Sequence, residues 1–377
     1  MGATAVVNEN LLNGLHRLLF RVLRVRLLWL IVLVLALFGV VDVVQALITA
    51  GVIVVVLVVA RLSLLRAVAP RVTALSPVRT GGRTLLAAAG PRRRIRITDP
   101  ATGSAAAVLK GHRDWVTALC EVDTGDRVLL ASAAKDRTVR LWDPDAAAQV
   151  AVLTGAGIGP SSVCQVRAPG GVLVASGAQD GKLRLWRPES GAPVHVLAPE
   201  AGEVMAVCGV PVKGGHGELL ASGHTDGTVR LWDPTTGEPV RTLTGHDGGW
   251  PNALCVVPGP KRVLLASAGT DERVRLWNPA TGNQLRAMKD DFGWLHALSP
   301  VTYGGRTLLA SGGDGPGVKL WDPADGRLVD TVGGAAFIFG PYGCGWVRAL
   351  CQVEVAGEPR LVTGGYDKRI GDWPLTA

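Results

Sequence analysis

One stretch of this chain recurs at a nearly constant interval. Residues 220–234 read Leu-Ala-Ser-Gly-His-Thr-Asp-Gly-Thr-Val-Arg-Leu-Trp-Asp-Pro, and close copies occupy residues 130–144 and 265–279. Looser copies end at Trp186, Trp321 and Trp373, and a seventh has Thr98 where the tryptophan would stand. The interval is 44 residues from Thr98 to Trp142 and rises to 52 from Trp321 to Trp373. A period of this length is typical of a propeller or a solenoid.

Each copy is divided into short apolar runs of the kind that form β-strands. In the repeat that ends at Trp142, residues 128–132 and 138–142 are aliphatic or β-branched and flank a turn at 135–137. A third run, 116–122, precedes them, and a fourth, 149–153, follows an Asp-Pro turn. Four strands in each of seven repeats predict an all-β, seven-bladed β-propeller built from four-stranded antiparallel blades.

The repeats resemble those of the WD-repeat family, in a bacterial form. The matching residues are Gly111, His112, Ser132, Asp136, Trp142 and Asp143 in one repeat, and Gly245, His246, Ser267, Asp271 and Trp277 in another. The resemblance runs from about Val72 to the C-terminus. Heavy use of alanine, glycine, valine and arginine with little lysine is typical of a GC-rich bacterium.

The resemblance implies a structural role for the polar residues of these repeats. In WD-repeat blades a serine hydroxyl, a histidine ring and a turn aspartate form a hydrogen-bonded relay with a buried tryptophan, whose indole N–H needs an acceptor. Two complete relays are expected: His112–Ser132–Asp136–Trp142 and His246–Ser267–Asp271–Trp277. Two blades would not be expected to carry a nucleophile at one register, which disfavours a catalytic triad.

No other motif supplies catalytic, cofactor or metal chemistry. One equivalent strand position holds Cys120, Cys164, Cys208, Cys255 and Cys351. Their shared register indicates small buried core residues rather than disulfide partners or metal ligands. Unpaired cysteines are typical of a reducing compartment. His195, His216 and His224 lie off the repeat register and are expected in scattered turns. We therefore expect no enzyme activity, no cofactor, no metal site and no small-molecule substrate.

The segment before the repeats is apolar enough to enter a membrane. Residues 1–26 are expected to form a polar tail and a basic amphipathic helix on the membrane surface; the alternative is that this stretch is only the flank of a signal anchor. Residues 27–60 are almost wholly apolar, interrupted by Asp42 and Gln45. Since one span needs about 20 residues, this length predicts an α-helical hairpin of two short spans that turns at Asp42. Arginines flank both outer ends, which predicts a propeller in the cytoplasm at the inner (plasma) membrane of a bacterium.

Other interpretations of residues 27–60 stay open. One is a single tilted span beside an interfacial helix, and another is a self-associating segment with Gly39 and Gly51 at helix contacts. A cleaved signal peptide is disfavoured, because the apolar run continues past any cleavage site.

The propeller domain is assigned to residues 61–377, and its closure poses a separate question. The sequence stops at Ala377, directly after the third strand of the last repeat. By repeat register, residues 62–66 would supply the closing fourth strand. The alternative is that a helix continues through Ala69 and the last blade has three strands.

Aromatic residues mark one face of the predicted propeller. Trp115, Trp250, Trp294 and Trp346 each directly precede the first strand of a repeat, so seven-fold symmetry places them around one mouth of the channel. An inserted loop with Phe337, Phe339 and Tyr342 connects repeats on that face, and Arg348 lies two residues beyond Trp346. Clustered Trp, Tyr and Arg are typical of binding hot spots. The alternative is that these tryptophans only cap their strands.

These observations favour a non-catalytic, membrane-tethered scaffold that binds a protein or peptide partner on the tryptophan-rich face, with a lipid membrane bound through residues 27–60. The alternative is a ligand-sensing module of a bacterial signalling or defence system with the membrane hairpin as its output. The net charge of +8 is spread through the repeated strands, so no nucleic-acid partner is expected.

Overall fold

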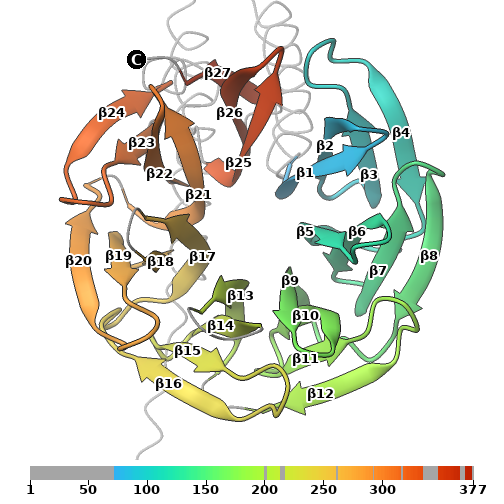
Figure 1. The fold of residues 1–377 in the computed structure, drawn as a ribbon, viewed down its shortest axis with the longest axis horizontal. Coiled ribbons are helices and arrows are strands. Elements are labelled where there is room, and N and C mark those ends of the chain that lie inside the picture. Colours follow the sequence, from blue (N-terminus) through green and yellow to red (C-terminus); the bar gives the residue numbers. More distant parts are fainter. Residues whose placement is uncertain are drawn as a thin grey trace, which may run out of the picture. The chain divides into compact units, whose positions relative to one another are not determined.

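The computed structural model describes residues 72–198, 202–212, 217–259, 262–291, 293–315, 317–333, 347–365 and 370–375. The chain divides into two compact units, Met1–Val68 and Ala69–Ala377. Every regular element of the described residues is a β-strand, and these strands form seven antiparallel sheets arranged around a central channel (Figure 1). The second unit is therefore a seven-bladed β-propeller.

The blades follow one another in chain order, and within each blade consecutive strands are neighbours. Blade 1 holds β1 (Ala74–Thr80), β2 (Arg83–Ala89), β3 (Arg94–Thr98) and β4 (Ala105–Lys110). Blade 2 holds β5 (Val116–Asp123), β6 (Val128–Ala134), β7 (Thr138–Asp143) and β8 (Ala148–Leu153). Blade 3 holds β9 (Pro160–Ala168), β10 (Gly171–Ala178), β11 (Leu183–Trp186) and β12 (Pro193–Leu197). Blade 4 holds β13 (Val204–Pro211), β14 (Glu218–His224), β15 (Val229–Trp232) and β16 (Pro239–Leu243).

Blade 5 holds β17 (Pro251–Pro258), β18 (Val263–Gly269), β19 (Arg273–Trp277) and β20 (Gln284–Lys289). Blade 6 holds β21 (Leu295–Tyr303), β22 (Arg306–Gly313), β23 (Val318–Trp321) and β24 (Leu328–Val332). Blade 7 holds β25 (Val347–Val355), β26 (Glu358–Gly365) and β27 (Gly371–Pro374). Six blades therefore have four strands, and the seventh has three within the described residues.

The burial of each strand follows from its place in the blade. In blade 2, six of the seven residues of β6 are buried, because this strand has a strand on each side and a blade against each face. The outermost strand β8 exposes most of its residues and buries Leu153. The four runs predicted for this repeat coincide with β5 to β8 to within two residues.

The repeated tryptophans pack between blades. Trp142 is 1% exposed and belongs to the core at the junction of blades 1 and 2. The same role is taken at the next five junctions by Trp186, Trp232, Trp277, Trp321 and Trp373. The core between blades 7 and 1 contains Val72, Leu86 and Ala88 but no tryptophan among the described residues, because blade 1 carries Thr98 at that position. The ring thus has one junction that is packed with smaller side chains.

The strand cysteines are small core residues. Cys120 lies opposite Ala131 in its blade, and Cys164 lies opposite Ala175 at the same register. All five described cysteines are free thiols. Burial raises the pKa of Cys120 to about 11, so its thiol stays protonated and unreactive at neutral pH.

Several sequence predictions concern residues outside the described ranges. These are the tail and amphipathic helix (1–26), the membrane hairpin (27–60), the closing strand (62–66) and the inserted aromatic loop. They stay predictions. Within the described part of the chain, no helix is long and apolar enough to cross a membrane.

Candidate functional site

The relay of blade 2 joins four side chains from the loop before β5, from β6, from the turn after β6 and from β7. His112 Nδ1 lies 2.9 Å from Asp136 Oδ2, and His112 Nε2 lies 2.6 Å from Ser132 Oγ. Trp142 Nε1 donates to Ser132 Oγ over 2.8 Å. Ser132 is fully buried, so no substrate can reach its hydroxyl. This arrangement ties four parts of the blade together, and its serine hydroxyl is not accessible.

Blade 5 repeats this geometry, with its arginine in hydrogen-bonding contact with the aspartate. His246 lies 2.9 Å from Asp271 and 2.7 Å from Ser267, and Trp277 Nε1 donates to Ser267 over 2.8 Å. The guanidinium of Arg275 donates to the other carboxylate oxygen of Asp271. Burial alone would raise the pKa of Asp271, but the hydrogen bonds and charges of His246 and Arg275 together hold it below its ordinary value. An ionised carboxylate therefore anchors both partners.

Blade 4 builds the relay from a different residue. Gly202 stands where the relay histidine would be, and His224 at the end of β14 takes its role: Ser222 Oγ lies 2.7 Å from His224 Nε2 and accepts from Trp232 Nε1 over 2.8 Å. The prediction that His224 lies in a scattered turn is wrong, because it is a fully buried strand residue. Burial, followed by the charge of Arg230, lowers its pKa to about 4.

Blade 6 replaces the relay histidine with a buried ion pair, which supports a structural role for the relay positions. In blade 6, Asp290 stands at the relay histidine position and pairs with Lys319 Nζ at 2.8 Å, and both side chains are less than 10% exposed. Trp321 Nε1 still donates to Ser311 Oγ over 2.8 Å. His195 was also expected in a turn, but it lies in β12, where Nε2 is 2.9 Å from Thr235 O. His216 lies outside the described residues.

Trp115, Trp250 and Trp294 occupy one equivalent position before the first strand of blades 2, 5 and 6. The carbonyl of each accepts a hydrogen bond from the turn between the second and third strands, at 2.8, 3.1 and 3.0 Å. Trp250 is 46% exposed and Trp294 is 48% exposed. Trp115 is half-buried, with Lys135 Nζ 4.9 Å from its ring centroid, in the range of a cation–π contact. Among the three described tryptophans at this position, the two exposed ones lie on adjacent blades.

Four members of the predicted aromatic face are not among the described residues. Trp346, Phe337, Phe339 and Tyr342 are outside the described residues, so the face is described here by Trp250 and Trp294. Glu203 fills the equivalent position in blade 4, where its carbonyl accepts from Thr225 N over 3.0 Å.

Two residues beyond this position, each blade contributes one side chain to the wall of the channel. These residues are Thr73, Thr117, Ser161, Met205, Asn252, His296 and Arg348. They and their neighbours on the inner strands line a cavity of about 240 Å³. Several bond to the next blade: Thr117 Oγ1 donates to Pro160 O over 2.6 Å, and Asn252 Nδ2 donates to Leu295 O over 3.0 Å. The channel wall is thereby held rigid.

A polar chain crosses from blade 7 to blade 6 at this wall. Arg348 Nη1 lies 3.1 Å from His296 Nδ1, and His296 Nε2 lies 2.8 Å from Asp314 Oδ1. Both contacts are satisfied when Nε2 carries the ring hydrogen, so that Arg348 donates to the histidine and the histidine donates to Asp314. Sequence reasoning selected Arg348 but missed His296 and Asp314, because the contact between Arg348 and His296 depends on the packing of adjacent blades.

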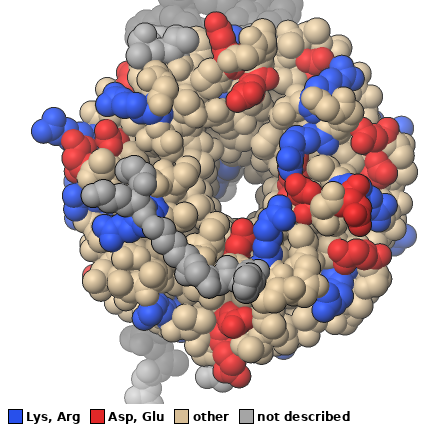
Figure 2. Space-filling model, viewed as in Figure 1, with Lys and Arg blue, Asp and Glu red and all other residues tan. Residues whose placement is uncertain are grey.

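The opposite ends of the inner strands are charged, with the charges paired across blades. Arg79 near the end of β1 lies 2.8 Å from Glu121 and 2.9 Å from Asp123 of blade 2. Glu218 of blade 4 accepts a hydrogen bond from Arg167 N over 3.0 Å. Figure 2 shows basic and acidic side chains alternating along one side of the channel opening. This rim offers alternating charge rather than a basic stripe.

Comparison with known proteins agrees with this geometry. The family described as WD domain, G-beta repeat (WD40) matches residues 103–143, 148–187, 191–233 and 237–278. These four segments, which match the WD40 repeat, extend from β4 of blade 1 to β19 of blade 5 in the seven-bladed propeller. A search of curated proteins finds no match to the chain.

Proposed function

We propose that this WD40-repeat propeller is a non-catalytic, membrane-tethered scaffold that binds a protein or peptide partner on the face marked by Trp250 and Trp294. WD40 propellers typically bind protein partners and are generally non-catalytic. The observation that carries the proposal is the exposure of nearly half of each of these two tryptophans on adjacent blades. Large exposed aromatic side chains on a rigid frame are typical of binding hot spots.

The expected binding energy follows from this exposure. Roughly half of a tryptophan side chain corresponds to about 100 Å² of surface, so burial under a partner contributes about 2 kcal/mol for each ring. The polar chain of Arg348, His296 and Asp314 begins two residues beyond this aromatic position and offers hydrogen-bonding groups beside the apolar surface. An aromatic anchor with adjacent polar groups is the composition that protein interfaces favour.

The membrane part of the proposal is supported by the sequence. Residues 27–60 are long and apolar enough for a hairpin, and arginines lie on both sides of them. We place the hairpin in the inner membrane of a bacterium with the propeller in the cytoplasm. Protease added to inverted membrane vesicles is then expected to digest the propeller, whereas protease added to right-side-out spheroplasts leaves it intact. The reverse pattern would contradict this topology.

The binding face is tested by affinity capture from native membranes with a matched control. The test variant is Trp250→Ala/Trp294→Ala, and the control is Val196→Ala/Val240→Ala, which removes apolar side chains that are 57% and 42% exposed on the outer strands β12 and β16. Partners that the wild type and the control retain should be lost from the test variant. With the purified partner, the dissociation constant should rise at least tenfold. Equal capture by both variants with unchanged melting temperatures would sink the proposal.

A further inference from the structure

A large pocket opens at the junction of blades 7 and 1. It has a volume of about 680 Å³ and is lined by residues of the second and third strands of blade 1, the turn between them, Val72, Val108 and Ile370. This is the junction whose core lacks a tryptophan among the described residues. The turn and the start of β3 contribute Arg92, Arg93, Arg94 and Arg96 to the wall.

Two of these arginines, Arg92 and Arg96, occupy the repeat positions at which other blades carry an aspartate and its arginine partner. Arg92 stands where blades 2 to 5 carry the turn aspartates Asp136, Asp180, Asp226 and Asp271. Arg96 stands where those blades carry Arg140, Arg184, Arg230 and Arg275. In each of those four blades the arginine and the aspartate form an ion pair, at 2.6 Å between Arg184 and Asp180. Blade 1 has therefore replaced the acidic partner with a second cation.

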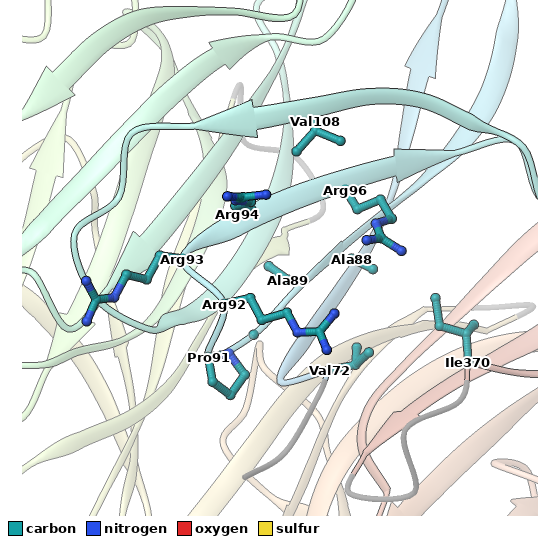
Figure 3. Close-up of a pocket in the computed structure, with 11 residues that line it drawn as sticks. Val72, Ala88, Ala89, Pro91, Arg92, Arg93, Arg94, Arg96, Val108 and Ile370 are labelled. Carbon is teal, nitrogen blue, oxygen red and sulfur yellow. The ribbon is translucent and has the colours of Figure 1, made fainter. Parts of the chain in front are cut away.

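Two of these arginines face one space. In Figure 3 the guanidinium groups of Arg92 and Arg96 extend over Ala88 and Ala89 toward Val72 and Ile370, whereas Arg93 extends away from them. Arg92, Arg94 and Arg96 are exposed, and none forms an ion pair with another described residue. The described lining of the pocket contains no acidic side chain. The site thus gathers positive charge that the described protein leaves uncompensated.

We propose that this pocket binds a nucleoside polyphosphate, a small molecule that carries a flat organic ring at one end and a chain of phosphate groups at the other. Arginine binds phosphate oxygens through two parallel N–H donors, and Arg92 and Arg96 present two such groups to one cavity. The apolar part of the wall, with Val72, Val108 and Ile370, suits a flat ring better than a free inorganic ion. The volume is in the range of small-molecule sites. This site lies at the junction of blades 7 and 1, whereas Trp250 and Trp294 belong to blades 5 and 6, and it does not depend on the function proposed for them.

The test measures binding of ATP, inorganic tripolyphosphate and adenosine to the full-length protein by calorimetry and by thermal shift. ATP should bind and raise the melting temperature, tripolyphosphate should bind more weakly, and adenosine should not bind detectably. Arg92→Gln/Arg96→Gln should weaken ATP binding at least tenfold. The control Arg241→Gln/Arg273→Gln removes the same charge from exposed positions in blades 4 and 5 and should change it less than twofold.

A second variant separates binding from folding. Arg92→Asp restores the acidic residue of the other blades, so it should pair with Arg96, abolish ATP binding and leave the melting temperature unchanged or higher. The proposal is overturned if no phosphate compound binds, if both double variants lose affinity equally, or if Arg92→Asp binds ATP as the wild type does. Binding only to vesicles that contain a phosphorylated inositol lipid, with no affinity for ATP, would also overturn it.

Discussion

The relay of blade 5 allows a quantitative prediction, because its aspartate holds a buried cation. In Asp271→Ala the guanidinium of Arg275, whose side chain is 7% exposed, loses its carboxylate, and His246 loses the acidic partner of its Nδ1, which then faces only Arg275 among its described contacts. Removing one member of a buried ion pair costs about 3–5 kcal/mol. Since the pair lies close to the surface turn, we take the lower end, about 3 kcal/mol.

The matched control is Asp226→Ala in blade 4. Asp226 stands at the equivalent turn position and pairs with Arg230, but these side chains are 33% and 22% exposed, and the described contacts of Asp226 include no histidine. Partly exposed pairs contribute less than about 1 kcal/mol. The two substitutions remove the same chemical group, so the difference between them isolates the effect of the buried environment.

The assay is thermal unfolding of the purified protein at neutral pH. With about 2 cal/mol/K of unfolding entropy per residue, a unit of roughly 300 residues loses about 1 °C of melting temperature for each 0.6 kcal/mol. Asp271→Ala should therefore lower the melting temperature by about 5 °C, and Asp226→Ala by less than about 2 °C.

A double variant tests the cause of this loss. If the orphaned charge is responsible, Asp271→Ala/Arg275→Met should recover part of the stability lost in Asp271→Ala. Equal losses in Asp271→Ala and Asp226→Ala, or no recovery in the double variant, would refute the reasoning.

Three further predictions concern a histidine, a turn and the closure of the ring. Between pH 6.5 and about 4, His224 is protonated in the unfolded state but not in the folded state, so the protein loses stability as the pH falls. In denaturant titrations at pH 6.5 and at about pH 4, the wild type should lose up to about 3 kcal/mol more unfolding free energy than His224→Gln. Equal losses in the two proteins would contradict this. Arg137 has a φ of 65°, so Arg137→Gly should raise the melting temperature by about 1 °C, whereas Gly181→Ala at the same turn position of blade 3 should lower it. If residues 62–66 close blade 7, deletion of 1–71 should expose the amides of β27 to hydrogen exchange and deletion of 1–60 should not; equal protection in both truncations would exclude closure.

The strands and the blade count could be predicted from the sequence because each blade is built from local hairpins. The run 128–132 and the turn at 135–137 specify the second and third strands of blade 2 without reference to distant residues. Because the pattern recurs seven times, aligning the copies confirms the strand positions that each copy predicts. The same repetition located the tryptophan position that Trp250 and Trp294 share.

Features that depend on contacts between blades or on replaced residues could not be predicted in this way. His224 joins the relay of blade 4, where Gly202 stands at the usual histidine position, and the sequence alone shows only a histidine outside the repeat register. The sequence does carry one sign of this role. His224 stands at the position that holds Ala134 in blade 2 and Gly269 in blade 5, so a polar residue replaces a small one there. The exposure of Trp250 and the partial cover of Trp115 by Lys135 likewise depend on neighbouring side chains.

The most direct test of the binding face is site-specific photo-crosslinking in the native membrane. A photoreactive phenylalanine analogue would replace Trp250 or Trp294 in turn, with Val240 on the outer strand β16 as the control position. The account predicts that positions 250 and 294 give adducts with one and the same protein and that position 240 does not. Adducts of equal yield at all three positions, or adducts from position 240 alone, would contradict it.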